Sequence, residues 1–122
     1  DANDYLAKAE AIHNAEIFED FYAISECDSE NTASPTLVCA QAANDLLNIK
    51  GIKASFVLTL YNNTIFISAR SMDEVNVQTI MEKLGGGGHR SVAGAQLKEN
   101  SIEDAKVRVK AVLKEMIEKG EI

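Results

Sequence analysis

The segment SFVLTLYNNTIFISAR, residues 55–70, carries the clearest structural signal in this chain. It predicts two strands, over 55–61 and 64–70, separated by Asn62 and Asn63. Asparagine tolerates the positive φ of a tight hairpin turn. Both strands are nearly continuous apolar runs, which are typical of a sheet covered on both faces. A buried hairpin at the centre of a layered domain is therefore expected.

Helices are predicted on both sides of this hairpin. Ser34 and Pro35 fit the N-cap and first position of a helix, and Gly51 suits its left-handed C-terminal cap. After the hairpin, residues 71–74 (SMDE) fit the capping box of a second helix. The apolar stripe of this second helix consists of Val77, Ile80, Met81 and Leu84.

The first part of the chain is predicted to be a connector. Residues 3–17 show a helical pattern with only a thin apolar stripe, which is unusual for a core helix. A strand over 18–27 and a polar loop over 28–33 follow. We therefore expect a connector helix over 1–17 and a single domain over 18–122.

The remaining elements set the fold class. A short strand is expected over 92–97, and a last helix begins at Ser101 and ends at Lys119 and Gly120. The order is then α-β-α-β-β-α-β-α, and such alternation is typical of a layered α/β domain. The expected fold is one α/β domain with a mixed sheet of about four to five strands and helices on both faces.

Composition and charge limit the function classes. The chain has 122 residues, of which 46% are hydrophobic and 25% charged, as in an ordinary globular domain. Lys and Arg total 12 against 19 Asp and Glu, which gives a net charge of −7. This balance argues against a broad grip on long nucleic acid, which needs a basic face. It is compatible with a small phosphate ligand, since one arginine and a few backbone N–H groups can hold a phosphate.

Cysteine usage and hydropathy indicate a cytoplasmic domain. Cys27 and Cys39 form no Cys-x-x-Cys pair, so free thiols in a reducing compartment are favoured over a disulfide or a reactive thiol. No apolar run is long enough to span a membrane, and no signal peptide opens the chain. We expect a soluble cytoplasmic domain, whether or not a longer parent protein is anchored in a membrane.

The segment GGGGHRSVAGAQL, residues 85–97, carries the clearest chemical signal. Its glycines leave the backbone open to a ligand, and their N–H groups can converge into a nest that binds an anion. A phosphate-binding P-loop is excluded because it needs Lys-Ser/Thr after its last glycine. A dinucleotide-binding turn is excluded because its glycines follow a strand, whereas these follow a predicted helix. The plain alternative is a flexible connector, although such connectors are usually Ser-rich and lie at domain edges.

Arg70 is a second candidate. It is the only Arg or Lys between Lys53 and Lys83, and it ends an apolar strand just before a predicted helix. In open α/β sheets, ligands gather at strand C-terminal ends beside helix N-termini. Arg70 is therefore predicted to neutralise a phosphate, and the alternative is a side chain that merely extends from the strand end into solvent.

These segments resemble a known family. The run 85–88 with His89, followed by Ala93 and Gly94, resembles the GGGH-x-x-A-A-G signature of the DHH-associated domain, with Val92 replacing the first alanine. That domain follows the DHH domain in a family of phosphodiesterases that includes the bacterial nano-RNases. Residues 55–89 are similar to the C-terminal domain of the cyclic di-AMP phosphodiesterases of Gram-positive bacteria.

The resemblance implies a function and a site. Mn²⁺ ions in an upstream DHH domain would activate water to hydrolyse a 3′–5′ phosphodiester to a linear dinucleotide. This chain would bind the nucleotide, and alone it is expected to lack a metal site and to be inactive. The residues expected to contact substrate are Arg70, Gly85, Gly86, Gly87, Gly88 and His89, with Ser68, Asn76 and Arg90 as weaker candidates.

Partners and alternatives follow from the same resemblance. The expected partners are a cyclic dinucleotide or short oligonucleotide, the upstream DHH domain, and a second copy of the chain. Two alternatives stay open: a nano-RNase acting on short oligoribonucleotides, and a stand-alone nucleotide-binding regulatory module. An Asp-His-His sequence upstream in the parent gene would favour the enzyme over the module.

Overall fold

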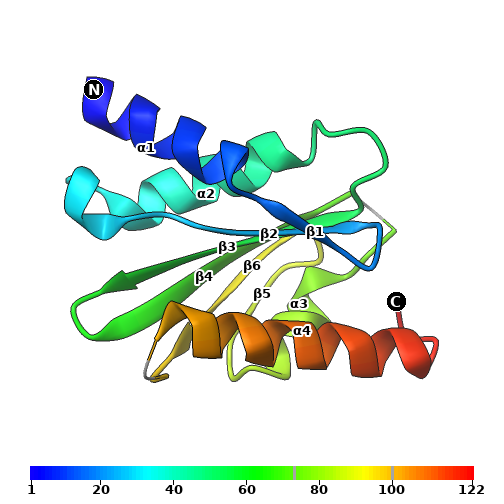
Figure 1. The fold of residues 1–122 in the computed structure, drawn as a ribbon. Helices are drawn as coiled ribbons and strands as arrows, with labels where there is room; N and C mark the ends of the chain where they lie inside the picture. Colours follow the sequence, from blue (N-terminus) through cyan, green and yellow to red (C-terminus); the bar gives the residue numbers. More distant parts are fainter. Residues whose placement is uncertain (73, 100) are drawn as a thin grey trace.

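The computed structural model describes residues 1–72, 74–99 and 101–122. A six-stranded mixed sheet in the order β1-β2-β3-β4-β6-β5 lies between two layers of helices (Figure 1). The helices are α1 (Ala2–His13), α2 (Pro35–Leu46), α3 (Val77–Glu82) and α4 (Ile102–Glu118), with a 3₁₀ turn, η1 (Ser29–Asn31). The strands are β1 (Glu16–Phe18), β2 (Tyr22–Glu26), β3 (Ala54–Tyr61), β4 (Thr64–Ser71), β5 (Gly87–Gly88) and β6 (Val92–Leu97). The α/β prediction is confirmed, with two short strands, β1 and β5, beyond those expected.

The β3–β4 hairpin forms as predicted. Asn62 and Asn63 have φ of 51° and 60°, the left-handed values of a tight hairpin turn. All of β3 from Ala54 to Thr59 is buried, so it is covered on both faces. β4 instead alternates between half-buried and buried residues, so one of its faces is covered only in part.

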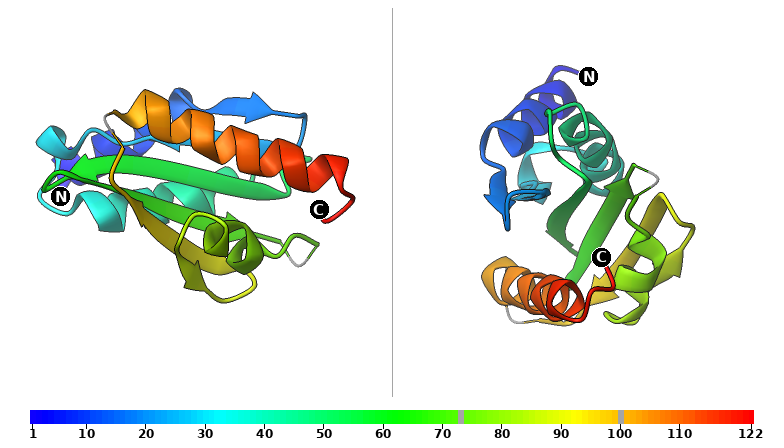
Figure 2. Two further views of the ribbon diagram at one scale, coloured as in Figure 1. Left: turned by 90° about the horizontal axis from the view of Figure 1, so that it is seen from below. Right: turned by 90° about the vertical axis from the view of Figure 1, so that its right-hand side faces the viewer.

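Two hydrophobic clusters lie on opposite faces of the sheet. α1 and α2 cover one face, where Ala11, Ala42 and Val57 are fully buried. α3 and α4 cover the other face, over the larger cluster that contains Phe56, Ile80 and Leu113. α2 packs on β3 and β4, whereas α3 packs on β6 and β5 (Figure 2). The α2 layer therefore stops short of the β6–β5 edge.

The N-terminal helix is shorter than predicted. It ends at His13, and residues 16–18 form the edge strand β1, antiparallel to β2. Glu19 and Asp20 turn the chain between them with φ of 51° and 69°. The single strand expected over 18–27 is therefore a hairpin, which the sequence hides because acidic residues occupy its left-handed positions. α1 packs on α2, and its Ala11 carbonyl accepts a hydrogen bond from Ser25 Oγ.

The capping box predicted at residues 71–74 is wrong. Ser71 is the last residue of β4, and its hydroxyl donates to the Val75 carbonyl at 2.6 Å. The N-cap of α3 is Asn76, whose side-chain oxygen accepts from the Gln78 N–H at 3.0 Å. Asp73, the third residue of the expected box, lies outside the described residues.

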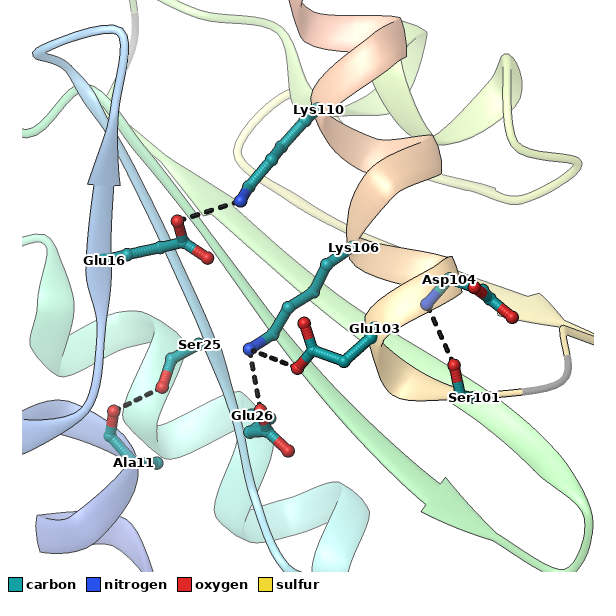
Figure 3. Close-up of polar contacts among 9 residues, drawn as sticks. All are labelled: Ala11, Glu16, Ser25, Glu26, Ser101, Glu103, Asp104, Lys106 and Lys110. Carbon is teal, nitrogen blue, oxygen red and sulfur yellow. Dashed lines mark hydrogen bonds and ion pairs between the residues drawn. The ribbon is translucent and has the colours of Figure 1, made fainter.

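Helix α4 begins at the predicted cap and is fixed to the sheet by lysines. Ser101 Oγ accepts the Asp104 N–H at 3.0 Å. Lys106 lies 2.7 Å from Glu26 of β2, and Lys110 lies 2.9 Å from Glu16 of β1 (Figure 3). These pairs join α4 to the β1–β2 side of the sheet, and the buried Val109 and Leu113 pack the helix on the core.

Candidate functional site

At β5 and β6, one face of the sheet has no helix over it (Figure 2). Side chains alternate between the faces of a strand, and the odd-numbered residues of β4 from 65 to 69 belong to the core beneath α3 and α4. Phe66, Ser68 and Arg70 therefore point to the opposite face. In the right-hand view of Figure 2, α1 and α2 lie on that side of β2 and β3, and no helix lies over β5 and β6 there.

The strand register brings Arg70 and His89 into one row. Arg70 of β4 pairs with Val92 of β6, and the Val92 carbonyl accepts a hydrogen bond from the His89 backbone N–H at 2.8 Å. Neighbouring strands are about 4.8 Å apart, so the backbones of Arg70 and His89 are separated by about 10 Å. Val92, which is exposed, lies between Arg70 and His89 in this row.

Next to this row lies a row of small residues. Ser68 pairs with Gly94, and Gly94 pairs with Gly87. None of these positions is fully buried. We call the whole surface the open face, which consists of Phe66, Ser68, Arg70, Gly87, His89, Val92, Gly94 and Gln96.

Arg70 brings a positive charge to this face. Its side chain is half-buried, and burial lowers the pKa of the guanidinium. Nη1 donates to the Ala69 carbonyl at 2.9 Å, and across residues 1–72, 74–99 and 101–122 no carboxylate forms an ion pair with it. A partly desolvated cation that forms no ion pair with a described carboxylate favours the binding of an anion such as phosphate.

The glycine run does not form an anion nest. Gly85, with φ of 83°, ends α3, where its N–H donates to Glu82 O at 3.1 Å and the Gly86 N–H donates to Met81 O at 2.8 Å. Gly87 and Gly88 form the edge strand β5. The predicted nest of free N–H groups is therefore wrong, because the helix end uses the first two of them.

Three of the four glycines are required by the fold itself. Gly85 and Gly88 have positive φ, and a Cβ on Gly88 would lie 2.6 Å from the Ala93 Cα. A Cβ on Gly86 would lie 2.1 Å from the Gly94 carbonyl oxygen. Gly87 differs, because its φ is not positive and a Cβ there would meet no atom within 4 Å. Of the four glycines, only Gly87 has neither a positive φ nor a neighbouring atom that would exclude a Cβ.

The other predicted residues separate into two groups. Ser68 lies on the open face, and its hydroxyl has no hydrogen-bond partner among the described residues. Asn76 is occupied as the cap of α3, and the Arg90 carbonyl accepts from the Val77 N–H at 2.9 Å. The structure therefore brings Arg70, Ser68, Gly87 and His89 together, and gives Asn76 and the Arg90 backbone structural roles at the start of α3.

Four residues of the open face were not predicted as site residues: Phe66, Val92, Gly94 and Gln96. Phe66 and Gln96 form a cross-strand pair beside a shallow depression of about 420 Å³, which Gly85, Gly86 and Gly94 also line. The available signal was the two-residue spacing of Phe66, Ser68 and Arg70 along one strand.

A larger depression lies elsewhere and has the wrong charge. It measures about 530 Å³ and is lined in part by Glu10, Glu26, Asp28 and Glu30, which would repel a phosphate.

In the described part of the chain, no group of three His, Cys, Asp or Glu side chains is arranged to hold a metal ion. No described helix combines the length and apolarity needed to cross a bilayer.

The two cysteines lie away from the open face. Cys27 and Cys39 are buried free thiols in the cluster beneath α1 and α2. A hydrogen bond with Cys27 and burial raise the pKa of Cys39 far above its ordinary value. Both features favour a structural role for Cys39.

Comparison with known proteins places this chain in a family context. The DHHA1 domain model matches residues 20–115. The cyclic-di-AMP phosphodiesterase PdeA of Listeria monocytogenes is 43% identical over 106 residues, 86% of this chain and 16% of that protein. The cyclic-di-AMP phosphodiesterase GdpP of Geobacillus thermodenitrificans is 40% identical over 118 residues, 96% of this chain and 18% of that protein. This chain thus spans less than a fifth of the length of either relative.

The fold also recurs in a solved structure. An exopolyphosphatase-related protein from Bacteroides fragilis superposes with a TM-score of 0.78 at 21% identity, covering 93% of this chain and 35% of that one. At this identity the likeness supports the fold alone.

Proposed function

Because the chain belongs to the DHHA1 domain family, we propose that it is the substrate-binding domain of a cyclic di-AMP phosphodiesterase and binds the nucleotide on its open face. The observation that carries the proposal is the half-buried guanidinium of Arg70, which forms no ion pair with any described carboxylate and lies in one row with His89 and beside Gly87. Relatives that share this family are phosphodiesterases, which supports a phosphate ester as the ligand.

Each residue of the site has a distinct task in this proposal. Arg70 neutralises a phosphate oxygen, and its planar guanidinium can make two parallel hydrogen bonds. His89 is exposed and donates to the same phosphate or to the neighbouring sugar. Gly87 lets the ligand approach the backbone of β5 without meeting a side chain. Ser68 lies between these groups and supplies a hydroxyl. Binding in one orientation is the contribution that this domain makes to the rate.

The hydrolytic chemistry is proposed to reside outside this chain. The residues of the open face include no carboxylate, and the described chain holds no cluster suited to a metal ion. We therefore assign no metal-dependent step to it. An upstream DHH domain with Mn²⁺ would supply metal-activated water, and this chain alone, given Mn²⁺, is expected to leave cyclic di-AMP intact.

An NMR titration tests the proposal. Cyclic di-AMP is added to the ¹⁵N-labelled chain, and shifts are expected at Ser68, Arg70, Gly87 and His89. In the Arg70→Ala variant these shifts should shrink at equal ligand concentration, while residues around Cys39 stay unchanged in both proteins. Absence of shifts at millimolar ligand, or shifts confined to the acidic depression, would overturn the proposal.

The same titration separates the substrate alternatives. A short oligoribonucleotide that binds the open face more tightly than cyclic di-AMP would replace the cyclic dinucleotide by a nano-RNase substrate. Binding without turnover in any longer form of the protein would favour a regulatory module.

A further inference from the structure

Phe66 is an aromatic side chain that does not pack into either hydrophobic cluster. It is half-buried on β4, and it belongs neither to the two buried clusters nor to the partly buried side chains packed against them. Its neighbours on the same strand face the other way into the core beneath α3 and α4. Burial in the core therefore does not account for a phenylalanine at this position.

Phe66 lines a shallow depression that has a polar side chain at its edge. Gln96 is its direct cross-strand partner and is exposed. The depression between them is lined by the glycines Gly85, Gly86 and Gly94, which project no side chains over the ring. An aromatic face, an adjacent amide and an otherwise bare backbone suit a planar, hydrogen-bonding ligand.

Nucleobases have this combination of properties. Stacking of a base on an aromatic side chain stabilises single-stranded nucleic acid complexes, and glutamine can bond both N6 and N7 of adenine. Single-stranded nucleotides are recognised in this way, by stacking together with hydrogen bonds to base edges.

The position of the pair relative to Arg70 fits one extended ligand. Phe66 and Arg70 point to the same face of β4 and are four residues apart, which is about 13 Å along a strand. Ser68 and Gly94 lie between them and carry little bulk. A phosphate at Arg70 and a base at Phe66 are then two parts of a single nucleotide ligand.

We propose that Phe66 and Gln96 form a purine subsite, in which Phe66 stacks on the base and Gln96 selects adenine. This inference rests on the proposed function, since it assigns the base of the ligand whose phosphate Arg70 holds. It predicts a ligand preference that the Arg70 contact alone would not produce.

The test measures dissociation constants for cyclic di-AMP and cyclic di-GMP by NMR titration of the chain. Phe66→Leu keeps apolar bulk but removes the stacking surface, and should weaken both ligands by about 5- to 150-fold. Gln96→Ala should weaken cyclic di-AMP and bring the ratio of the two dissociation constants towards one. Tyr61→Leu, an exposed aromatic at the end of β3, is the matched control and should bind like the unaltered chain.

The outcomes separate this inference from the proposed function. If Arg70→Ala weakens binding while Phe66→Leu and Gln96→Ala do not, the purine subsite is refuted and the phosphate site stands. If the unaltered chain binds neither ligand, both proposals fail. Thermal melting of each variant must match the unaltered chain within a few degrees. If Phe66→Leu melts early, Phe66→Met, which also keeps apolar bulk without an aromatic ring, repeats the test.

Discussion

Gly87 offers the sharpest test of the site, because the structure separates its role from those of the adjacent glycines. A side chain at Gly87 meets no protein atom within 4 Å, and the backbone there has no positive φ. Gly87→Ala should therefore change the free energy of unfolding by no more than about 0.5 kcal/mol, as for an ordinary surface substitution. Gly87→Val adds more bulk in the same open space and should also fold.

The matched variant is Gly86→Ala. Its Cβ would lie 2.1 Å from the Gly94 carbonyl oxygen and 2.7 Å from the Ala95 Cα, so backbone must move. Overpacking of this kind costs about 1–3 kcal/mol, which lowers the melting temperature by roughly 3–18 °C for a domain of this size. Gly86→Ala should thus melt early, whereas Gly87→Ala and Gly87→Val should melt like the unaltered chain.

Ligand binding should show the opposite order of sensitivity. If the nucleotide lies against β5, a side chain at position 87 collides with it, and a clash of about 1–3 kcal/mol weakens binding by about 5- to 150-fold. Gly87→Val should exceed Gly87→Ala in this effect. The assay pairs thermal melting with titration of cyclic di-AMP for all three variants. Unchanged affinity in Gly87→Val, in a protein that melts normally, would refute close approach of the ligand to β5.

Further predictions concern the charges and the thiols. Arg70→Ala should cost about 2–5 kcal/mol of nucleotide binding free energy, measured from dissociation constants. Arg70→Lys should recover only part of this loss, because lysine lacks the planar guanidinium. Equal affinity of Arg70→Ala and the unaltered chain would show that the Arg70 side chain does not contact the ligand. His89 is exposed, so His89→Ala should weaken nucleotide binding without lowering the melting temperature, and a fall in that temperature alone would assign it to the fold instead. Cys27 and burial raise the pKa of Cys39, so Cys39 should resist iodoacetamide at pH 8 in the folded chain and react after unfolding. Mass spectrometry follows the labelling, and fast labelling of Cys39 in the folded chain would contradict this prediction.

Local signals in the sequence were sufficient for much of the fold. The turn at Asn62 and Asn63 depends only on how readily asparagine adopts a left-handed backbone, so it could be predicted without any tertiary contact. Ser101 caps α4 through an interaction three residues away in the chain, which is equally local. The glycine and histidine motif identified the family, which the match over residues 20–115 confirmed.

Competition between local and long-range contacts explains the errors. Ser71 has the chemistry of a helix cap, but its N–H donates to the Ser91 carbonyl at 3.1 Å and its Cα pairs with Ala54, so β4 continues through it. Asn76 then caps α3 instead. A local capping preference of about 1 kcal/mol is outweighed by sheet pairing that only the assembled fold provides.

Residue types alone did not predict the open face, nor which of the four glycines could accept a side chain. β3 and β4 are similar apolar runs, yet β3 is buried on both faces over residues 54–59, whereas one face of β4 is only half-buried, because α2 packs on β3 and β4 and the sheet continues beyond it to β6 and β5. Gly86 and Gly87 are the same residue type, but a Cβ on Gly86 would point into the backbone of β6, whereas a Cβ on Gly87 would point into open space. Alternation along a strand fixes which residues share a face, but the layer that covers that face comes from distant segments, so exposure is a property of the packed structure.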